Sequence, residues 1–174
     1  MIHAIQRPGS ADDGIVALLA ACHARIRSFS ALAVRLADVQ GGDTSRSVPE
    51  ACVAVTRYFQ EALPLHVRDE EDTVLPRLWG QSLDLDRTLL GMRAQHAEHE
   101  TIVTDLLVAL EAVAAQPADS GRRDRLRGPA QRVAVALEEH LVVEERTLFP
   151  VLAVLPKDIQ AQMVTELRAR RTDR

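Results

Sequence analysis

Residues 66–76 read HVRDEEDTVLP, and residues 140–150 read HLVVEERTLFP. Five of the eleven positions are identical, and the offset of 74 residues needs no gap. In each segment a histidine is followed by two adjacent glutamates, at the fourth and fifth positions after it, and by a proline at the tenth. Either the chain is an old duplication that retained its polar residues, or both copies hold the same chemical group.

The repeat continues upstream of each segment. Residues 21–24 read ACHA, and residues 94–97 read AQHA. The histidines of these tetrapeptides precede the histidines of the two longer segments by 43 and 44 residues. The sequence therefore predicts a helix pair that is repeated once, with His23 and His96 at matching positions.

The composition favours packed helices over a sheet. The chain has 174 residues, of which 47% are apolar but only 3% aromatic, whereas strands prefer aromatic and β-branched residues. Positive and negative charges are mixed at a net charge of −4, so we expect no nucleic-acid partner. No continuous apolar run approaches the roughly 20 residues of a membrane span, and the first residues lack the pattern of a secretion signal. We expect no membrane partner.

Two cysteines do not make a disulfide framework in a chain of this length. Cys22 and Cys52 therefore favour a reduced, cytoplasmic protein. Cys22 is next to His23, but one helical step is a rotation of about 100°. We expect Cys22 to point away from the face of His23 and to act as a small packed thiol.

Hydrophobic periodicity predicts helices over 10–40, 47–79, 84–115 and 129–155, and a short last helix over 157–170. The predicted fold is all-α: an antiparallel up-down-up-down four-helix bundle over 10–155, with a C-terminal helical appendage over 156–174.

The proposed helix ends depend on a few local signals. Ser10 is a candidate N-cap, and Ser47 with Glu50 forms a capping-box pattern. Pro129 after Gly128 suggests a helix start. Pro64 predicts a kink just before His66, and Pro150 is expected to bend or end its helix.

Every predicted bundle helix carries a histidine on its apolar face, and the second and fourth add a glutamate one turn later. These positions recur at intervals of three and four residues, which is the pattern of a buried helix face. The faces comprise Leu19, His23 and Ile26; Phe59, Leu63, His66, Glu70 and Val74; Leu89, Met92, His96, His99, Val103, Leu106, Leu110 and Val113; and Val133, Leu137, His140, Glu144, Leu148 and Val151.

Buried ionisable side chains are costly unless they are paired or bind a metal. A histidine and a glutamate four residues apart on a helix can reach one point in the bundle centre. Imidazole and carboxylate donors without a thiolate favour iron or manganese over structural zinc. The alternative is a metal-free bundle held by buried His–Glu pairs, which desolvation makes a weak source of stability.

The other acidic residues near the motifs are expected to be solvated charges on outer faces: Asp69, Glu71, Asp72, Glu138, Glu139 and Glu145. Glu71 and Glu145 recur in both copies of the motif. They are therefore also candidates for orienting the metal ligands from outside.

These motifs resemble the hemerythrin-like family, also called HHE cation-binding domains, over roughly residues 12–155. The resemblance is carried by His23, by His96, and by the two segments from histidine through Glu-Glu to Leu75-Pro76 and Phe149-Pro150. It implies a bundle around a non-haem di-iron centre, with two iron ions bridged by carboxylates and by an oxo or hydroxo oxygen. The implied terminal ligands are His23, His66, His96 and His140, and the implied bridging ligands are Glu70 and Glu144.

The third predicted helix departs from the pattern of oxygen-carrying hemerythrins, which place a second ligating histidine four residues after the first. Here that position is Glu100, and the extra histidine is His99. His99 could add to His96 or replace it as a ligand. We favour His96, because it keeps the repeat offset and the shared alanines.

The resemblance leaves several functions open. One is a di-iron protein that binds or reacts with O2, peroxide or NO at an open iron position, with peroxide-degrading or oxidase-like turnover undecided. Another is an iron-binding or redox sensor without turnover, in which the segment 157–170 reports metal occupancy to a protein partner. No sequence feature indicates an organic substrate.

Overall fold

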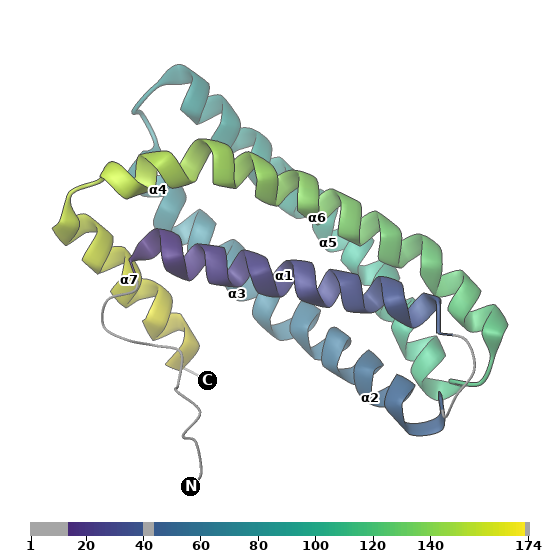
Figure 1. The fold of residues 1–174 in the computed structure, drawn as a ribbon. Helices are drawn as coiled ribbons and strands as arrows, with labels where there is room; N and C mark the ends of the chain where they lie inside the picture. The colour runs from purple at the N-terminus through teal and green to yellow at the C-terminus, as the bar shows by residue number, and fades with distance from the viewer. Residues whose placement is uncertain (1–13, 40–43, 173–174) are drawn as a thin grey trace, which may run out of the picture.

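The computed structural model describes residues 14–39 and 44–172, and every regular element in these two ranges is helical. The all-α prediction is therefore confirmed. Figure 1 shows the long helical segments packed side by side, with the shorter helix α7 at one end of them. The elements are α1 (Ile15–Ala37), α2 (Thr44–Arg57), η1 (Tyr58–Ala62), α3 (Leu63–Asp69), η2 (Glu70–Val74), α4 (Leu75–Leu78), α5 (Leu83–Ala115), α6 (Ser120–Val154) and α7 (Lys157–Thr172).

The four segments enclose a common centre. The elements from α2 to α4 follow one another without a break and form the second segment. Helix α1 packs against α2 and α6, and α5 packs against the same two elements from the other side. Each segment therefore has two neighbours in the bundle and turns one face inward.

Two prolines interrupt the second segment without ending it. Pro64 and Pro76 each follow a π-helical stretch, η1 and η2, by two residues. Proline has no N–H, and its ring collides with the carbonyl four residues earlier in an α-helix. In both cases that carbonyl lies in a π-helical turn, which is wider than an α-helical turn. The helical segment therefore continues past each proline. The predicted kink before His66 thus takes the form of η1.

Two of the predicted helix starts are wrong, those of α6 and α2. Helix α6 begins at Ser120 and not at Pro129, because the Asp119 carboxylate caps it by accepting hydrogen bonds from the N–H groups of Gly121 (2.8 Å) and Arg122 (3.3 Å). The same helix continues past Pro150 to Val154.

Helix α2 begins at Thr44, so Ser47 lies in its first turn and not at its N-cap. The proposed cap Ser10 falls outside the described residues. Helix α5 has the expected start, where the Ser82 hydroxyl accepts a hydrogen bond from the Leu85 N–H at 3.2 Å.

The apolar core is divided into two clusters. The larger cluster includes Ile26, Leu63, Val103 and Leu137, and the smaller cluster includes Leu19, Val74, Met92 and Leu148. On each of the four segments, the predicted ligand histidine lies between a member of one cluster and a member of the other. A polar layer therefore separates two dry regions of core.

The predicted buried faces are confirmed at nearly every position. Val151 is only partly buried, and the next residue, Leu152, takes the core position in α6. His96 is partly buried as a residue, although its side chain is only 8% exposed.

Asp69 contradicts its predicted place on a solvated face, because its side chain is fully buried. Helix α7 covers it. Arg170 Nη1 lies 2.8 Å from Asp69 Oδ1, and Arg171 Nη2 lies 2.5 Å from Asp69 Oδ2. Met163 and Leu167 of α7 also join the smaller apolar cluster. The last helix is therefore held to the bundle by both apolar packing and a buried ion pair.

Helix α1 is long and apolar enough to cross a membrane, judged by length and composition alone. Core helices of soluble proteins pass the same test. In this bundle α1 packs against α2 and α6 and carries the buried His23. The prediction that the protein has no membrane partner stays a prediction.

Replacing Asp69 with alanine should destabilise the metal-free protein by about 3–5 kcal/mol, because two guanidinium groups lose a buried partner. The matched control is Asp72→Ala, which removes an exposed carboxylate 3.3 Å from Arg68 and should cost about 1 kcal/mol or less. Denaturant unfolding of both variants provides the measurement. Equal losses of unfolding free energy in the two variants would show that the buried ion pair stabilises the protein no more than the exposed one.

Candidate metal centre

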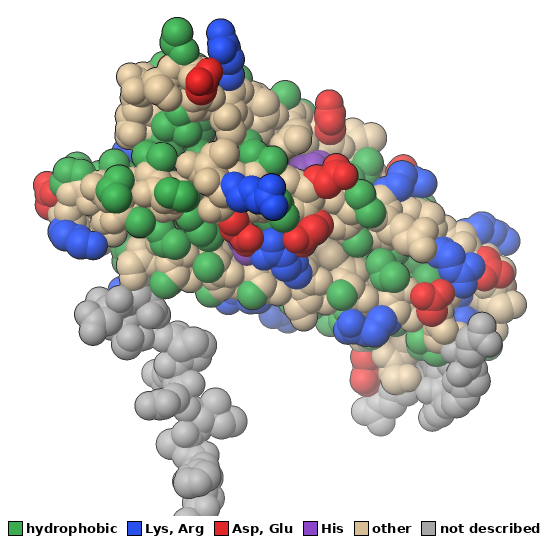
Figure 2. Space-filling view, turned by 45° about the horizontal axis from the view of Figure 1, so that its top comes forward, with side chains coloured by type: hydrophobic (Ala, Val, Ile, Leu, Met, Phe, Trp, Pro, Cys, Tyr) green, Lys and Arg blue, Asp and Glu red, His purple; other side chains and the backbone are tan. Residues whose placement is uncertain are grey.

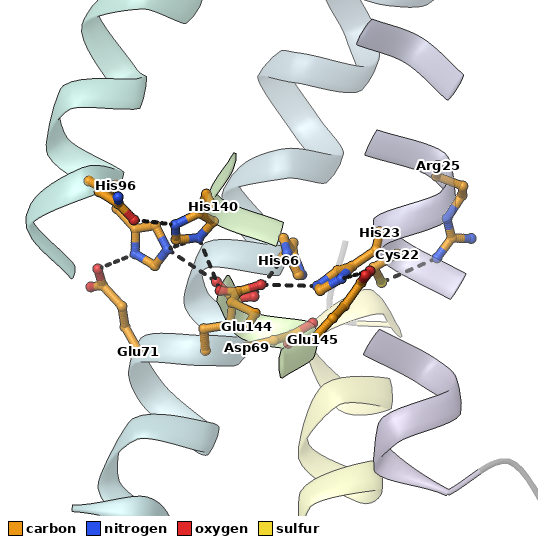
Figure 3. A network of polar contacts seen from close by, with 12 residues as sticks. Cys22, His23, Arg25, His66, Asp69, Glu71, His96, His140, Glu144 and Glu145 are labelled. Atoms are coloured by element: carbon orange, nitrogen blue, oxygen red, sulfur yellow. Dashed lines mark hydrogen bonds and ion pairs between the residues drawn. The ribbon is translucent and has the colours of Figure 1, made fainter. Parts of the chain in front are cut away.

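Six side chains converge on the polar layer from all four helical segments (Figure 3). They come from α1, from α3 and the first residue of η2, from α5 and from α6. All six predicted ligands are present: His23, His66, Glu70, His96, His140 and Glu144.

The six side chains form two donor groups that share both glutamates. One group contains His23 and His66, and the other contains His96 and His140. Within each group the possible donor atoms lie within 4.8 Å of one another.

Each glutamate directs one oxygen to each group. Glu70 has Oε1 at 2.9 Å from His66 Nε2 and Oε2 at 3.1 Å from His96 Nε2. Glu144 has Oε2 at 3.1 Å from His23 Nε2 and Oε1 at 3.0 Å from His140 Nε2. This is the arrangement required of two carboxylates that bridge a pair of cations.

Many of the donor atoms are buried without a hydrogen-bond partner among residues 14–39 and 44–172. They are His23 Nε2, both ring nitrogens of His66, Glu70 Oε2 and both carboxylate oxygens of Glu144. Buried polar atoms are normally paired, and leaving them unpaired is costly. A cation in each group would satisfy these atoms, so the residues fit a dinuclear metal site.

The outer nitrogens of three histidines indicate which ring nitrogen is free to bind. His23 Nδ1 lies 2.9 Å from Glu145 Oε1, and His96 Nδ1 lies 2.9 Å from Glu71 Oε1. His140 Nδ1 lies 2.9 Å from the side-chain carbonyl oxygen of Gln95. These oxygens can only accept, so each Nδ1 carries the proton.

The Nε2 lone pairs of these three rings therefore face the centre. His96 Nε2 and His140 Nε2 are 3.1 Å apart. Two lone pairs at that distance repel each other, unless a proton or a cation lies between or beside them. The arrangement is suited to a metal, and it also explains the recurrence of the second glutamate in each motif. Glu71 and Glu145 each accept a hydrogen bond from the outer nitrogen of a histidine, His96 and His23 respectively.

Arg27 supports one of these outer contacts. Its Nη1 donates to Glu145 Oε1 at 2.7 Å, and its Nε donates to Glu138 Oε2 at 2.7 Å. The hydrogen bond from Arg27, and to a smaller degree that from His23, lowers the pKa of Glu145. Glu145 is thereby kept ionised as an acceptor for the imidazole of His23.

Charge interactions in the metal-free centre favour protonated imidazoles. Burial lowers the pKa of His66, but Glu70, Cys22 and Glu144 outweigh burial and raise it well above its usual value. Glu70 likewise raises the pKa of His96 against the effect of burial. Burial raises the pKa of Glu70, but His66 and His96 hold it well below its usual value. A bound metal must displace these protons, so metal binding is coupled to proton release.

The model of the family described as Hemerythrin HHE cation binding domain matches residues 14–152. The chain belongs to this family. No curated protein matches the chain. Hemerythrin HHE domains bind metal cations, and the two groups of histidines and glutamates lie within the matched range.

His99 and Glu100 lie outside both donor groups of this hemerythrin domain. Glu100 is exposed, and the His99 ring packs edge-on against His140 with ring centroids 5.0 Å apart. Burial, with smaller contributions from His140 and His96, lowers the pKa of His99 to about 4. His99 is therefore a neutral packing residue beside the centre, which favours His96 as the ligand.

A cavity of about 20 Å³ adjoins the donors in the hemerythrin domain. Leu63, Val67, Leu137 and Leu141 line it together with His99 and ligand side chains from both groups. A single water needs about 10–15 Å³. The cavity therefore has room for about one molecule of the size of water.

Sequence reasoning missed two contributors to this site. Gln95 occupies the position that Cys22 has in the other copy of the tetrapeptide, so no shared pattern marks it. Arg27 follows His23 by four residues, but charged residues at that spacing are common on exposed helix faces. Only the packing of α1 against α6 shows that Arg27 reaches Glu145.

Replacing His96 with leucine should lower the amount of bound Fe2+ by at least half, because one donor group loses a ligand. The control is His99→Leu on the same helix, which should retain the wild-type stoichiometry. Elemental analysis after anaerobic loading with Fe2+ measures both. Loss of iron in His99→Leu with retention in His96→Leu would reverse the assignment.

Proposed function

We propose that this hemerythrin HHE protein holds a non-haem di-iron centre with a bridging oxo or hydroxo oxygen and binds or reacts with O2, peroxide or NO. The observation that carries the proposal is the pair of donor groups that share Glu70 and Glu144. Iron bound there would supply a redox-active Lewis acid with coordination positions open to a small ligand.

The charge and type of the donors support iron. Four imidazoles contribute neutral nitrogen donors, and the carboxylates of Glu70 and Glu144 offset part of the charge of two divalent cations. No cysteine belongs to either donor group among the described residues. Nitrogen and oxygen donors of this kind suit non-haem iron, whereas thiolates would favour zinc or iron–sulfur clusters.

The surroundings of the donors support small ligands. Glu71, Glu145 and Gln95 hold protons on the outer nitrogens, so the inner nitrogens stay oriented toward the centre. Apolar side chains above and below the layer exclude bulk water. The 20 Å³ cavity beside the donors has room for about one molecule of the size of water.

We also infer that the four segments run antiparallel, up-down-up-down, as the short connections predict. The order of the two apolar clusters along each segment supports this topology. Helices α1 and α5 pass from the smaller cluster through the histidine to the larger one, whereas the α2–α4 segment and α6 pass in the opposite order. The arrangement brings all four histidines to one depth.

We propose a reduced, cytoplasmic setting without a nucleic-acid or membrane partner. Cys22 and Cys52 are both free thiols, which supports a reducing compartment. Figure 2 shows acidic and basic side chains interspersed on the displayed face, without a basic surface of the kind that binds phosphates.

The protein purified aerobically from iron-rich medium should contain about two iron ions per chain and show a visible charge-transfer band that changes on addition of azide or peroxide. Absorption spectra and elemental analysis make the measurement. Removing the iron with a chelator should abolish the band and lower the melting temperature, because the buried donors lose their partner. A colourless, iron-free protein would contradict the di-iron proposal.

A second candidate function is an iron or redox sensor without turnover. It is favoured by one observation: the buried ion pair that anchors α7 ends on Asp69, the residue immediately before the shared Glu70. A shift of Glu70 can therefore move the adjacent Asp69 and, through its ion pairs, helix α7. Helix α7 would then act as the reporter to a protein partner.

For a sensor, removal of iron should increase proteolytic cleavage within α7 by several-fold, while cleavage elsewhere changes less. Limited proteolysis followed by mass spectrometry compares the iron-loaded and iron-free protein. Identical protection of residues 157–172 in the two states would exclude this function and leave small-ligand binding as the proposal.

A further inference from the structure

Two hollows of the bundle share one wall. The cavity of about 20 Å³ beside the donors and a groove of about 450 Å³ between α1 and α6, the α1–α6 groove, are both lined by Ile26, Leu137 and Leu141. Each of these three residues is at most 3% exposed. The groove reaches the surface, because it is also lined by the exposed residues Ala31 and Arg35. A single layer of aliphatic side chains therefore separates the metal ligands from a groove that is open to solvent.

The shared wall follows from the positions of the ligands in the sequence. Ile26 comes three residues after His23 on α1, and Leu137 and Leu141 flank His140 on α6. Helices α1 and α6 pack along each other (Figure 1). The packing that brings ligands of these two helices to the centre therefore also places the three aliphatic side chains beside it.

Beyond the shared wall, the groove continues with small and aliphatic side chains. Ala31 and Val34 line it on α1, and Ala134 lines it on α6. A neutral apolar molecule can occupy such a surface without losing hydrogen bonds. An ion or a strongly hydrogen-bonding molecule would lose part of its hydration there.

The charged side chains at the groove are turned to solvent and paired. Arg27 donates to Glu138 from Nε at 2.7 Å and from Nη2 at 3.1 Å, and the two side chains are 34% and 48% exposed. This ion pair ties α1 to α6 across the groove. The Ser30 hydroxyl also lies on the groove, buried and without a hydrogen-bond partner in the described part of the chain. It is one donor available to a guest.

The largest pocket offers a poorer route to the centre. This pocket of about 680 Å³ shares with the inner cavity only the side chain of His66. Passage from it would require the ring of a predicted metal ligand to swing aside. A leucine side chain, in contrast, changes rotamer without disturbing a ligand.

We propose that the α1–α6 groove is the route by which a neutral diatomic gas, O2 or NO, reaches the centre, and that Leu137 and Leu141 are its gate. Ile26 forms the fixed side of the gate, because a β-branched side chain is stiff at χ1. The inference rests on the proposed small-ligand function and narrows it. Neutral gases cross an aliphatic wall readily, whereas peroxide has to give up hydrogen bonds.

A first experiment tests the route without iron. O2 is paramagnetic, so it speeds the NMR relaxation of methyl groups that it approaches. The full chain is measured under O2 and under N2 in the presence of Zn2+, which is diamagnetic and does not react with O2. The methyl groups of Ile26, Leu137 and Leu141 should show a several-fold larger increase than those of Leu110 and Leu126. These two controls are 0% exposed and line neither hollow. Equal increases would overturn the route.

A second experiment blocks the groove from outside. Ala134→Phe fills the groove without touching the inner cavity, and it should slow the association of NO with the Fe2+-loaded protein by about ten-fold. The matched control is Val135→Phe at the next position of α6, which is 57% exposed and lines neither hollow. It should associate as the wild type does. Stopped-flow absorption measures both, and equal rates in the two variants would contradict the route.

A third experiment opens the gate. Leu141→Ala should speed NO association several-fold, whereas Leu152→Ala should not. Leu152 is equally buried on the same helix but belongs to the smaller apolar cluster, so the two variants lose similar packing. Equal acceleration in both would indicate general loosening and overturn the gate. If Leu141→Ala folds poorly, Ala134→Phe still decides, because position 134 is only partly buried.

The outcomes separate this inference from the function on which it rests. A wild-type protein that binds no Fe2+ contradicts the di-iron proposal, while the methyl relaxation still tests the route. A protein that binds Fe2+ and NO but is insensitive to Ala134→Phe keeps the function and loses the route. Hydrogen peroxide should react equally with Ala134→Phe and Val135→Phe. Slower reaction in Ala134→Phe would overturn the restriction to neutral gases.

Discussion

The structure depends on a layer of imidazoles and carboxylates held in the dry centre of a helical bundle. Two apolar clusters enclose this layer, and several of its nitrogen and oxygen atoms have no hydrogen-bond partner in the part of the chain that the structure describes. Ion pairing alone compensates such burial poorly, because desolvation offsets most of the Coulomb attraction. The layer is therefore best explained as a binding site whose occupant supplies the missing interactions. Metal binding and bundle stability should be linked for the same reason.

The repeat is built so that neither half completes a donor group. Glu70 and Glu71 of the first half contact His96 of the second, and Glu144 and Glu145 of the second half contact His23 of the first. Each half thus contributes a bridging oxygen and an outer acceptor to the other. Separation of the two helix pairs would open both donor groups at once. The donor groups therefore form only when the bundle is intact.

The two halves differ in what surrounds the shared pattern. Arg27 supports Glu145 four residues after His23, whereas the residue four positions after His96 is the exposed Glu100. The first half passes Pro64 and Pro76 through π-helical stretches, whereas α6 of the second half stays one continuous helix through Pro129 and Pro150. Helix α7 forms ion pairs with the first half of the repeat, through Asp69 and through Arg77. The two donor groups therefore have similar ligands in unequal electrostatic surroundings.

The sequence by itself determined the helical class, the buried faces and the six residues that meet in the two donor groups, because helical periodicity and the repeated histidine–glutamate spacing are local properties of the chain. It could not place Asp69, Gln95 or Arg27, whose contacts depend on which helices become neighbours. It also misjudged the start of α6, where a capping aspartate at 119 prevails over the glycine and proline at 128 and 129. Tertiary structure decided these points, since a side chain acquires its partners only when segments far apart in sequence pack against each other.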